Sequence, residues 1–136
     1  MSHGSLAKEF YNTAKMIIGD VSNIEYLEYP AGQDLVEYKK KLTDILKRNE
    51  ETLVLVDLFG GSPFVLATQV FAEMKFSENV EIYTGLNLPM LLEVATIADK
   101  CSLQEAKELL VDAGVGGIID FRKKTNEMHG GNKKCL

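Results

Sequence analysis

The sequence predicts an α/β fold, in a three-layer, doubly wound arrangement around a mainly parallel β-sheet. The run Thr52–Val56 is continuously apolar and partly β-branched, as expected for a strand that is covered on both faces. Segments of strand character also alternate along the chain with segments in which apolar residues recur at helical spacing. Such alternation is typical of parallel sheets that are flanked by helices.

The first half of the chain is predicted to contain two helices and two strands. Residues 5–18 and the segment that begins at Leu35 both carry apolar residues at helical spacing, and the second is rich in lysine on its outer face. Residues 24–29 have the character of a short strand, which Pro30 ends. The buried strand Thr52–Val56 follows.

The second half repeats the pattern of strand, loop and helix. Pro63 and Pro89 each favour the first turn of a helix, and Ser62 is the expected N-cap of the first of these helices. The strand between them is predicted at Val80–Thr84. Ser102 then opens a further helix as part of a capping box, and that helix is expected to end near residue 114.

The last residues of the chain are predicted to form a short strand followed by a tail outside the domain. Residues 117–121 (GIIDF) are expected to form a last short strand, and residues 123–136 a polar, flexible tail. The chain then has a single domain, residues 1–122.

Composition indicates a soluble protein of a reducing compartment. Of the 136 residues, 46% are hydrophobic and 26% charged, and the net charge of −5 argues against a large basic surface for nucleic acid. No apolar run approaches the ~18 residues of a membrane span. Cys101 and Cys135 lie far apart without metal-like spacing, so they are interpreted as reduced thiols of a cytoplasmic protein.

Candidate functional residues gather at the carboxyl ends of the predicted strands, where open parallel sheets bind ligands. His3 precedes the first helix between small neighbours that admit a bulky partner; the other interpretation is a surface histidine or a tag remnant. Asp57 ends a buried strand, where a carboxylate is costly unless it is hydrogen-bonded. It could fix the tautomer of an imidazole, or it could cap the adjacent loop.

A glycine-rich turn follows Asp57 and leads into a predicted helix. Gly60 and Gly61 allow close backbone approach, Ser62 adds a hydroxyl, and the helix dipole favours negative charge, so the turn could receive a tetrahedral anion. It is neither a Walker A loop nor a nucleophile elbow. Many strand–helix turns contain glycine without binding a ligand, and that interpretation stays open.

Two more polar residues carry weaker signals. Asn87, in the loop before Pro89, is interpreted as a scaffold that bonds to neighbouring loops. His129 lies in the predicted tail and is not expected to act in chemistry.

Three motifs together resemble a known family. They are SHG at residues 2–4, VDLFGGSPF at residues 56–64 and GLNLPML at residues 85–91. Their order and separation resemble the enzyme IIA component of the mannose family of the bacterial sugar phosphotransferase system, from Ser2 to about Arg122.

The resemblance implies a phosphocarrier that accepts a phosphoryl group on His3 from HPr and passes it to a IIB protein or domain. Asp57 would orient the histidine, and Gly60, Gly61 and Ser62 would receive the phosphoryl oxygens, without a cofactor or a metal. The family forms homodimers that exchange a C-terminal antiparallel strand, here residues 117–121. Association with the membrane is indirect, through the IIC/IID permease.

Two features depart from the family pattern. Val65 stands where the family usually has asparagine, so an altered hydrogen bond is expected in the first turn of the helix. Family members also carry a strand before the histidine, and we expect roughly six to eight more apolar residues before Met1 in the natural protein. The alternative function is a non-catalytic regulatory or binding module of the same fold that reports sugar status.

Overall fold

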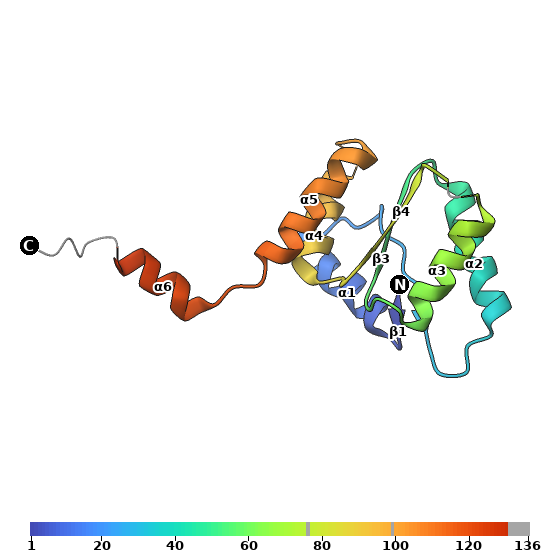
Figure 1. Ribbon diagram of the computed structural model, residues 1–136, viewed down its shortest axis with the longest axis horizontal. Coiled ribbons are helices and arrows are strands. Elements are labelled where there is room, and N and C mark those ends of the chain that lie inside the picture. Colours follow the sequence, from blue (N-terminus) through green and yellow to red (C-terminus); the bar gives the residue numbers. More distant parts are fainter. Residues whose placement is uncertain (76, 99, 131–136) are drawn as a thin grey trace, which may run out of the picture.

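The computed structural model describes residues 1–75, 77–98 and 100–130, in which strands and helices alternate (Figure 1). The strands are β1 (Ser2–His3), β2 (Glu28–Tyr29), β3 (Thr52–Val56) and β4 (Val80–Thr84). The helices are α1 (Leu6–Ile18), α2 (Leu35–Arg48), α3 (Ser62–Glu73), α4 (Leu88–Ile97), α5 (Leu103–Gly116) and α6 (Phe121–Gly130). The mixed α/β class is therefore confirmed.

The strands form two parallel pairs. β3 pairs with β4 over its whole length, from Thr52 opposite Val80 to Val56 opposite Thr84. β1 pairs with β2, which is shorter than the strand predicted for residues 24–29. Met1 links the pairs, because its amino group donates to the Leu55 carbonyl at 2.7 Å and its own carbonyl accepts from the Asp57 N–H at 3.3 Å.

The core lies on both faces of β3, since successive strand residues point to opposite sides. On one face, Val54 and Val56 pack with buried residues of α2 and α3. On the other face, Leu55 packs with buried residues of α1, α4 and α5. Figure 1 shows α2 and α3 on one side of the β3–β4 pair, and α1, α4 and α5 on the opposite side. β3 is therefore covered on both faces, and its carboxyl end positions Asp57.

Side-chain caps determine where several helices begin. Asp34 accepts a hydrogen bond from the Glu37 N–H at the start of α2, and Ser102 and Glu105 form the predicted capping box at the start of α5. α5 continues to Gly116, beyond its predicted end near residue 114. None of the described helices is long and apolar enough to cross a membrane.

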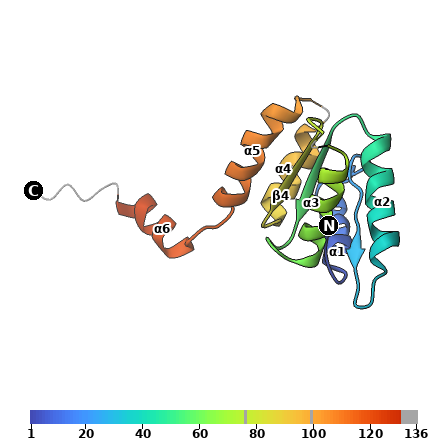
Figure 2. The same ribbon diagram turned by 45° about the vertical axis from the view of Figure 1, so that its right-hand side comes forward.

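The predicted strand at residues 117–121 is wrong for the single chain. Residues 117–120 form neither helix nor strand, and Phe121 begins α6, which also includes the first residues of the predicted tail. A short apolar segment becomes a strand only where another strand offers hydrogen-bond partners, and here the segment leads away from the body (Figure 2). Residues 131–136, and with them Cys135, lie outside the described residues.

Candidate functional site

His3 is held by Asp57 at the carboxyl end of β3. Nδ1 of His3 lies 2.8 Å from Oδ2 of Asp57, and the same oxygen accepts a hydrogen bond from the His3 backbone N–H at 2.9 Å. The side chain of His3 is 43% exposed, whereas that of Asp57 is only 12% exposed. The structure thus brings together the two residues that the sequence singled out, one accessible and one shielded.

The environment of Asp57 favours its charged form. Burial alone would raise the pKa of this carboxyl group. The hydrogen bonds from the backbone and ring of His3, the charge of His3 and a bond from the Leu58 N–H at 2.9 Å outweigh burial and hold the pKa below its ordinary value. At neutral pH Asp57 is therefore an ionised acceptor, and the nitrogen of His3 that faces it carries the proton.

The other ring nitrogen, Nε2, lies against the backbone of Gly61. A Cβ atom added to Gly61 would be 3.0 Å from Nε2 and 2.4 Å from Cε1 of His3, closer than side chains approach. With Nδ1 bonded to Asp57, Nε2 keeps its lone pair and faces the start of α3. Only glycine allows the ring to lie this close.

The turn before α3 differs in detail from the sequence-based expectation. Gly61 is the N-cap, and Ser62, which was expected in that role, is the first helical residue. The Gly61 N–H donates to the Leu58 carbonyl at 3.3 Å, so Gly61 contributes space rather than a free donor. Gly60 has a φ of +76°, the left-handed conformation that a turn of this kind requires.

Backbone donors remain at the start of α3. The first helical hydrogen bond runs from the Val65 N–H to the Gly61 carbonyl. The N–H groups of Ser62 and Phe64 precede it and have no carbonyl partner within the helix, and Pro63 has no N–H. These two donors and the positive end of the helix dipole form an anion-binding surface next to Nε2.

Sequence analysis missed two residues that support His3. Ser2 is fully buried, and its hydroxyl accepts a hydrogen bond from the Ala7 N–H at 2.5 Å, so it anchors the start of α1. Tyr29 lies opposite His3 in the β1–β2 pair, and its ring meets the imidazole edge-on with 6.3 Å between centroids. Ser2 had a local signal, since serine often caps a helix. The role of Tyr29 depends on strand pairing and has no local signal.

The site lies on an open surface with apolar residues around it. Leu58 and Phe59, in the loop between β3 and α3, are 59% and 74% exposed, and the Phe59 ring packs against Phe64. Val65 is also exposed on α3. Small-molecule sites usually bury most of their ligand in a concave pocket, whereas this surface suits contact with another protein.

Asn87 has the scaffolding contacts that the sequence predicted. Its side-chain oxygen accepts from the Met90 N–H and caps α4, and its amide nitrogen donates to the Gly114 carbonyl of α5 at 3.2 Å. Asn87 therefore ties α4 to α5.

The described residues offer no cluster of histidine, cysteine, aspartate and glutamate that could hold a metal ion. Cys101 is a free thiol that donates to the Ile97 carbonyl. The side chain of His129 lies outside the described part of the structure.

Fold and site together define a small α/β protein that presents one oriented imidazole at a helix N-terminus. Comparison with known families identifies it further. The chain belongs to the family described as "PTS system fructose IIA component", whose model matches residues 1–111. The resemblance found in the three sequence motifs is thereby confirmed.

Individual relatives support the same assignment. The chain is 30% identical over 130 residues to the "PTS system mannose-specific EIIAB component" of Escherichia coli (strain K12). That match covers 93% of this chain and 39% of the relative, so the chain spans about two-fifths of its length. Among solved structures, the mannose/sorbose specific IIA subunit from Enterococcus faecalis superimposes with a TM-score of 0.77 at 29% identity, over 89% of this chain and 90% of that one. The PTS IIA protein associated with the fucose utilization operon from Streptococcus pneumoniae does so with a TM-score of 0.72 at 32% identity, over 92% of each chain.

Proposed function

We propose that this chain is a cytoplasmic phosphocarrier of a sugar phosphotransferase system, which accepts a phosphoryl group on Nε2 of His3 from HPr and passes it to a IIB protein. The proposal rests on the different environments of the two ring nitrogens of His3. Asp57 occupies Nδ1 at 2.8 Å, so Nε2 retains its lone pair next to the N-terminus of α3. The family assignment supports a phosphocarrier role in sugar uptake.

The transfer step needs only an oriented nucleophile and a site for negative charge. The lone pair of Nε2 forms the new bond to phosphorus while the bond between phosphorus and the donor breaks, and the donor atom keeps its electron pair. The ring becomes positively charged, and ionised Asp57 stabilises that charge through Nδ1–H. Passing the group to the acceptor reverses these changes.

The phosphoryl oxygens would be received at the first turn of α3. The N–H groups of Ser62 and Phe64, and the Ser62 hydroxyl, are the donors available there. Gly60 and Gly61 contribute conformation and space instead of further donors. The proposed phosphate-binding set therefore keeps Gly60, Gly61 and Ser62, with altered roles for the two glycines.

The functional unit would be a homodimer in which residues 117–121 pair with the sheet of a second copy. Ile118 and Phe121 are 83% and 78% exposed, and Ile119 and Met128 are also exposed, so this segment carries apolar surface that the single chain does not cover. A closed two-fold exchange would bury it reciprocally. The protein would contact the IIC/IID permease only through its partners.

Labelling with purified components tests the proposal. The chain is incubated with phosphoenolpyruvate, enzyme I and HPr, and its intact mass is measured before and after brief acid treatment. We expect an acid-labile gain of one phosphate that His3→Ala abolishes and His129→Ala leaves unchanged. A label that persists in the His3→Ala protein would refute the assignment of the carrier residue.

A further inference from the structure

Three aromatic rings form a row that leads from the candidate site into the molecule. The ring of Tyr29 meets the imidazole of His3 with 6.3 Å between centroids and 83° between planes, and it meets the ring of Tyr38 with 5.2 Å and 89°. Both contacts have the edge-to-face geometry that the charge distribution of aromatic rings favours. His3 and Tyr29 come from the paired strands β1 and β2, whereas Tyr38 comes from α2. The row therefore connects the proposed nucleophile to α2.

Exposure falls along this row. The side chain of His3 is 43% exposed, Tyr29 is half-buried, and Tyr38 is only 1% exposed. The backbone of Tyr38 is also held in place, because its N–H donates at 3.1 Å to the carbonyl of Asp34, the N-cap of α2. Tyr38 is thus a fixed support for the two more exposed rings.

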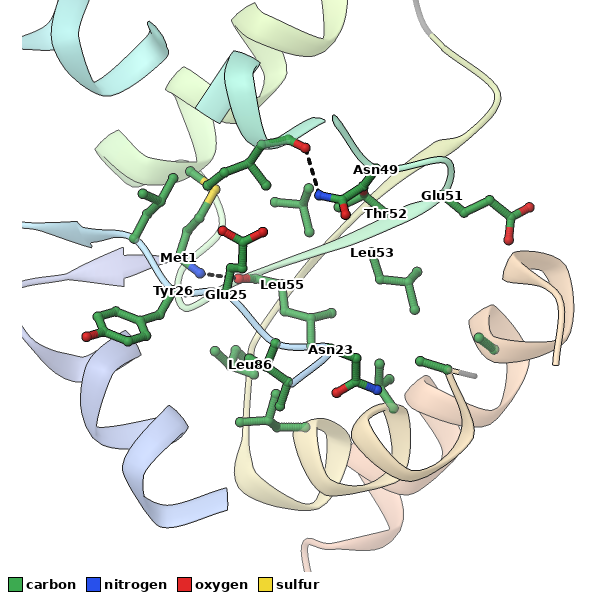
Figure 3. A pocket seen from close by; sticks show the side chains of 18 of the residues that line it. Met1, Asn23, Glu25, Tyr26, Asn49, Glu51, Thr52, Leu53, Leu55 and Leu86 are labelled. Carbon is green, nitrogen blue, oxygen red and sulfur yellow. Dashed lines mark hydrogen bonds between the residues drawn. The ribbon is translucent and has the colours of Figure 1, made fainter. Parts of the chain in front are cut away.

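Tyr38 lies away from the cavity in this part of the core. That cavity, of about 280 Å³, lies beside β3 (Figure 3), and residues further along α2 contribute to its lining, among them Leu42, Ile45 and Leu46. Neither Tyr38 nor Tyr29 lines it. Closely packed side chains transmit strain to their neighbours. A change at Tyr38 would therefore be passed on to Tyr29.

The ring of Tyr38 has a partner, whereas its hydroxyl has none. The hydroxyl oxygen is buried without a hydrogen-bond partner among the described residues. Burial, the charge of Asp57 and nearby Tyr29 all raise the pKa of Tyr38, so the hydroxyl stays neutral. A buried hydroxyl without a partner costs stability, and phenylalanine would fill almost the same volume without that cost. Substitution can therefore separate the ring that touches Tyr29 from the hydroxyl.

The contact with Tyr29 completes the constraints on the imidazole. The hydrogen bond to Asp57 holds Nδ1 of His3, and the backbone of Gly61 lies against Cε1. These are neighbouring ring atoms, so the two contacts still allow the ring to tilt about the line that joins them. The edge-on ring of Tyr29 opposes this tilt, which would change the direction of the lone pair on Nε2.

The helix that carries Tyr38 also packs against the helix that carries the proposed phosphate donors. Leu42 of α2 packs with Ala67 and Val70 of α3 in one buried cluster. The N-terminus of α3 is the anion-binding surface next to Nε2. A ring supported from α2 is therefore held in a fixed relation to α3.

We propose that Tyr38 is a positioning residue of the phosphocarrier site, whose ring holds Tyr29 against His3 and so keeps the lone pair of Nε2 directed at the N-terminus of α3. Its effect on transfer rests on the proposed function, whereas its effect on the imidazole exists in the isolated chain. Tyr38 is too deeply buried to touch a partner protein. It therefore acts on the rate of the chemical step and leaves the affinity for HPr unchanged.

The test introduces Tyr38→Leu into the full chain and measures two quantities. The order parameter of the His3 ring is obtained from nuclear magnetic relaxation of its carbon atoms, and kcat and KM are obtained for transfer from phosphorylated HPr. We expect a lower order parameter and a kcat reduced roughly ten-fold at unchanged KM, because a displacement of about 1 Å costs up to about 100-fold. Tyr38→Phe, which keeps the ring, should restore both quantities and unfold at the same or a higher Tm.

Two further variants separate positioning from a general loss of core packing. Leu110→Ala removes a fully buried side chain from the cluster on the opposite face of β3, so it should lower the Tm but keep the order parameter and kcat of the parent. Tyr29→Leu interrupts the row at a half-buried ring, and it should lower the order parameter even if Tyr38→Leu does not fold.

The proposal is overturned if a folded Tyr38→Leu or Tyr29→Leu protein keeps the parental order parameter, or loses it without a change in kcat. An equal loss of order in Leu110→Ala would also overturn it, because general loosening would then be the cause. If the parent accepted no phosphoryl group from HPr, the proposed function would fail, while the order parameters would still decide whether Tyr38 holds the ring of His3.

Discussion

A Gly61→Ala substitution would place a methyl group against the ring of His3. The added Cβ would lie 2.4 Å from Cε1, whereas ordinary contacts begin near 3.4 Å, so the ring has to move by about 1 Å. The backbone of Gly61, with φ −71° and ψ 164°, is accessible to alanine. Replacing a glycine at such a position stabilises a protein by roughly 0.4–1 kcal/mol, because the unfolded chain loses freedom. Displacing a reacting group by about 1 Å slows a reaction on the order of 100-fold.

We therefore expect Gly61→Ala to retain or slightly raise the free energy of unfolding while slowing the phosphorylation of His3 about 100-fold. Urea unfolding and single-turnover transfer from phosphorylated HPr measure the two quantities. Gly60→Ala is the matched control: it leaves an open space around the new Cβ but forces alanine to a φ of +76°, at a cost of about 1–2 kcal/mol in stability. Its effect on transfer should be the smaller of the two. If a folded Gly61→Ala protein transferred the phosphoryl group at the parent rate, the position of the His3 ring would not require glycine at residue 61.

Three other outcomes are expected. Asp57→Asn should keep the fold but slow transfer about 10- to 100-fold, because an amide cannot stabilise the imidazolium charge; equal rates at neutral pH would favour a purely capping role. The difference in free energy of unfolding between the parent and Asp57→Asn, measured by urea titration, should shrink as the pH falls below about 4. The pKa of Asp57 is lower in the folded than in the unfolded chain, so its ionised form stabilises the fold at a pH above the unfolded-state pKa, and protonation removes this contribution. Deleting residues 116–136 should convert a dimer into an unstable or aggregating protein by light scattering, and a well-folded monomer of the intact chain would rule out strand exchange.

The strands show how far local sequence predicts this fold. Thr52–Val56 and Val80–Thr84 were predicted with their observed bounds, because each is a short run rich in β-branched and other strand-forming residues. Residues 24–29 and 117–121 have similar local character, yet the first keeps only Glu28–Tyr29 as strand and the second forms none. Their state depends on whether another strand lies alongside. Such a neighbour is distant in sequence or belongs to another chain, so no local pattern reports it.

At the site, residue types were predictable and their mutual geometry was not. Asp57 and the glycine-rich turn stood out because they follow a predicted strand, and His3 stood out because it precedes the first predicted helix between small neighbours. Gly61 provides space for the ring of His3, and its N–H is already bonded to the Leu58 carbonyl. Both facts depend on the path of the turn, which the sequence does not show. The shift of the N-cap from Ser62 to Gly61 is a change of one residue, within the usual uncertainty of helix ends.

A single oxygen of Asp57 anchors both the main chain and the ring of His3, and this has a kinetic consequence for encounters between proteins. An unrestrained surface side chain changes rotamer within picoseconds to nanoseconds, so many collisions would meet the wrong face of the ring. Here the two hydrogen bonds hold the ring in one orientation, so in the proposed phosphocarrier a larger share of brief encounters with another protein would be productive. If the chain exchanges a phosphoryl group with two different proteins, as proposed, weak and short-lived binding to each of them would then be sufficient.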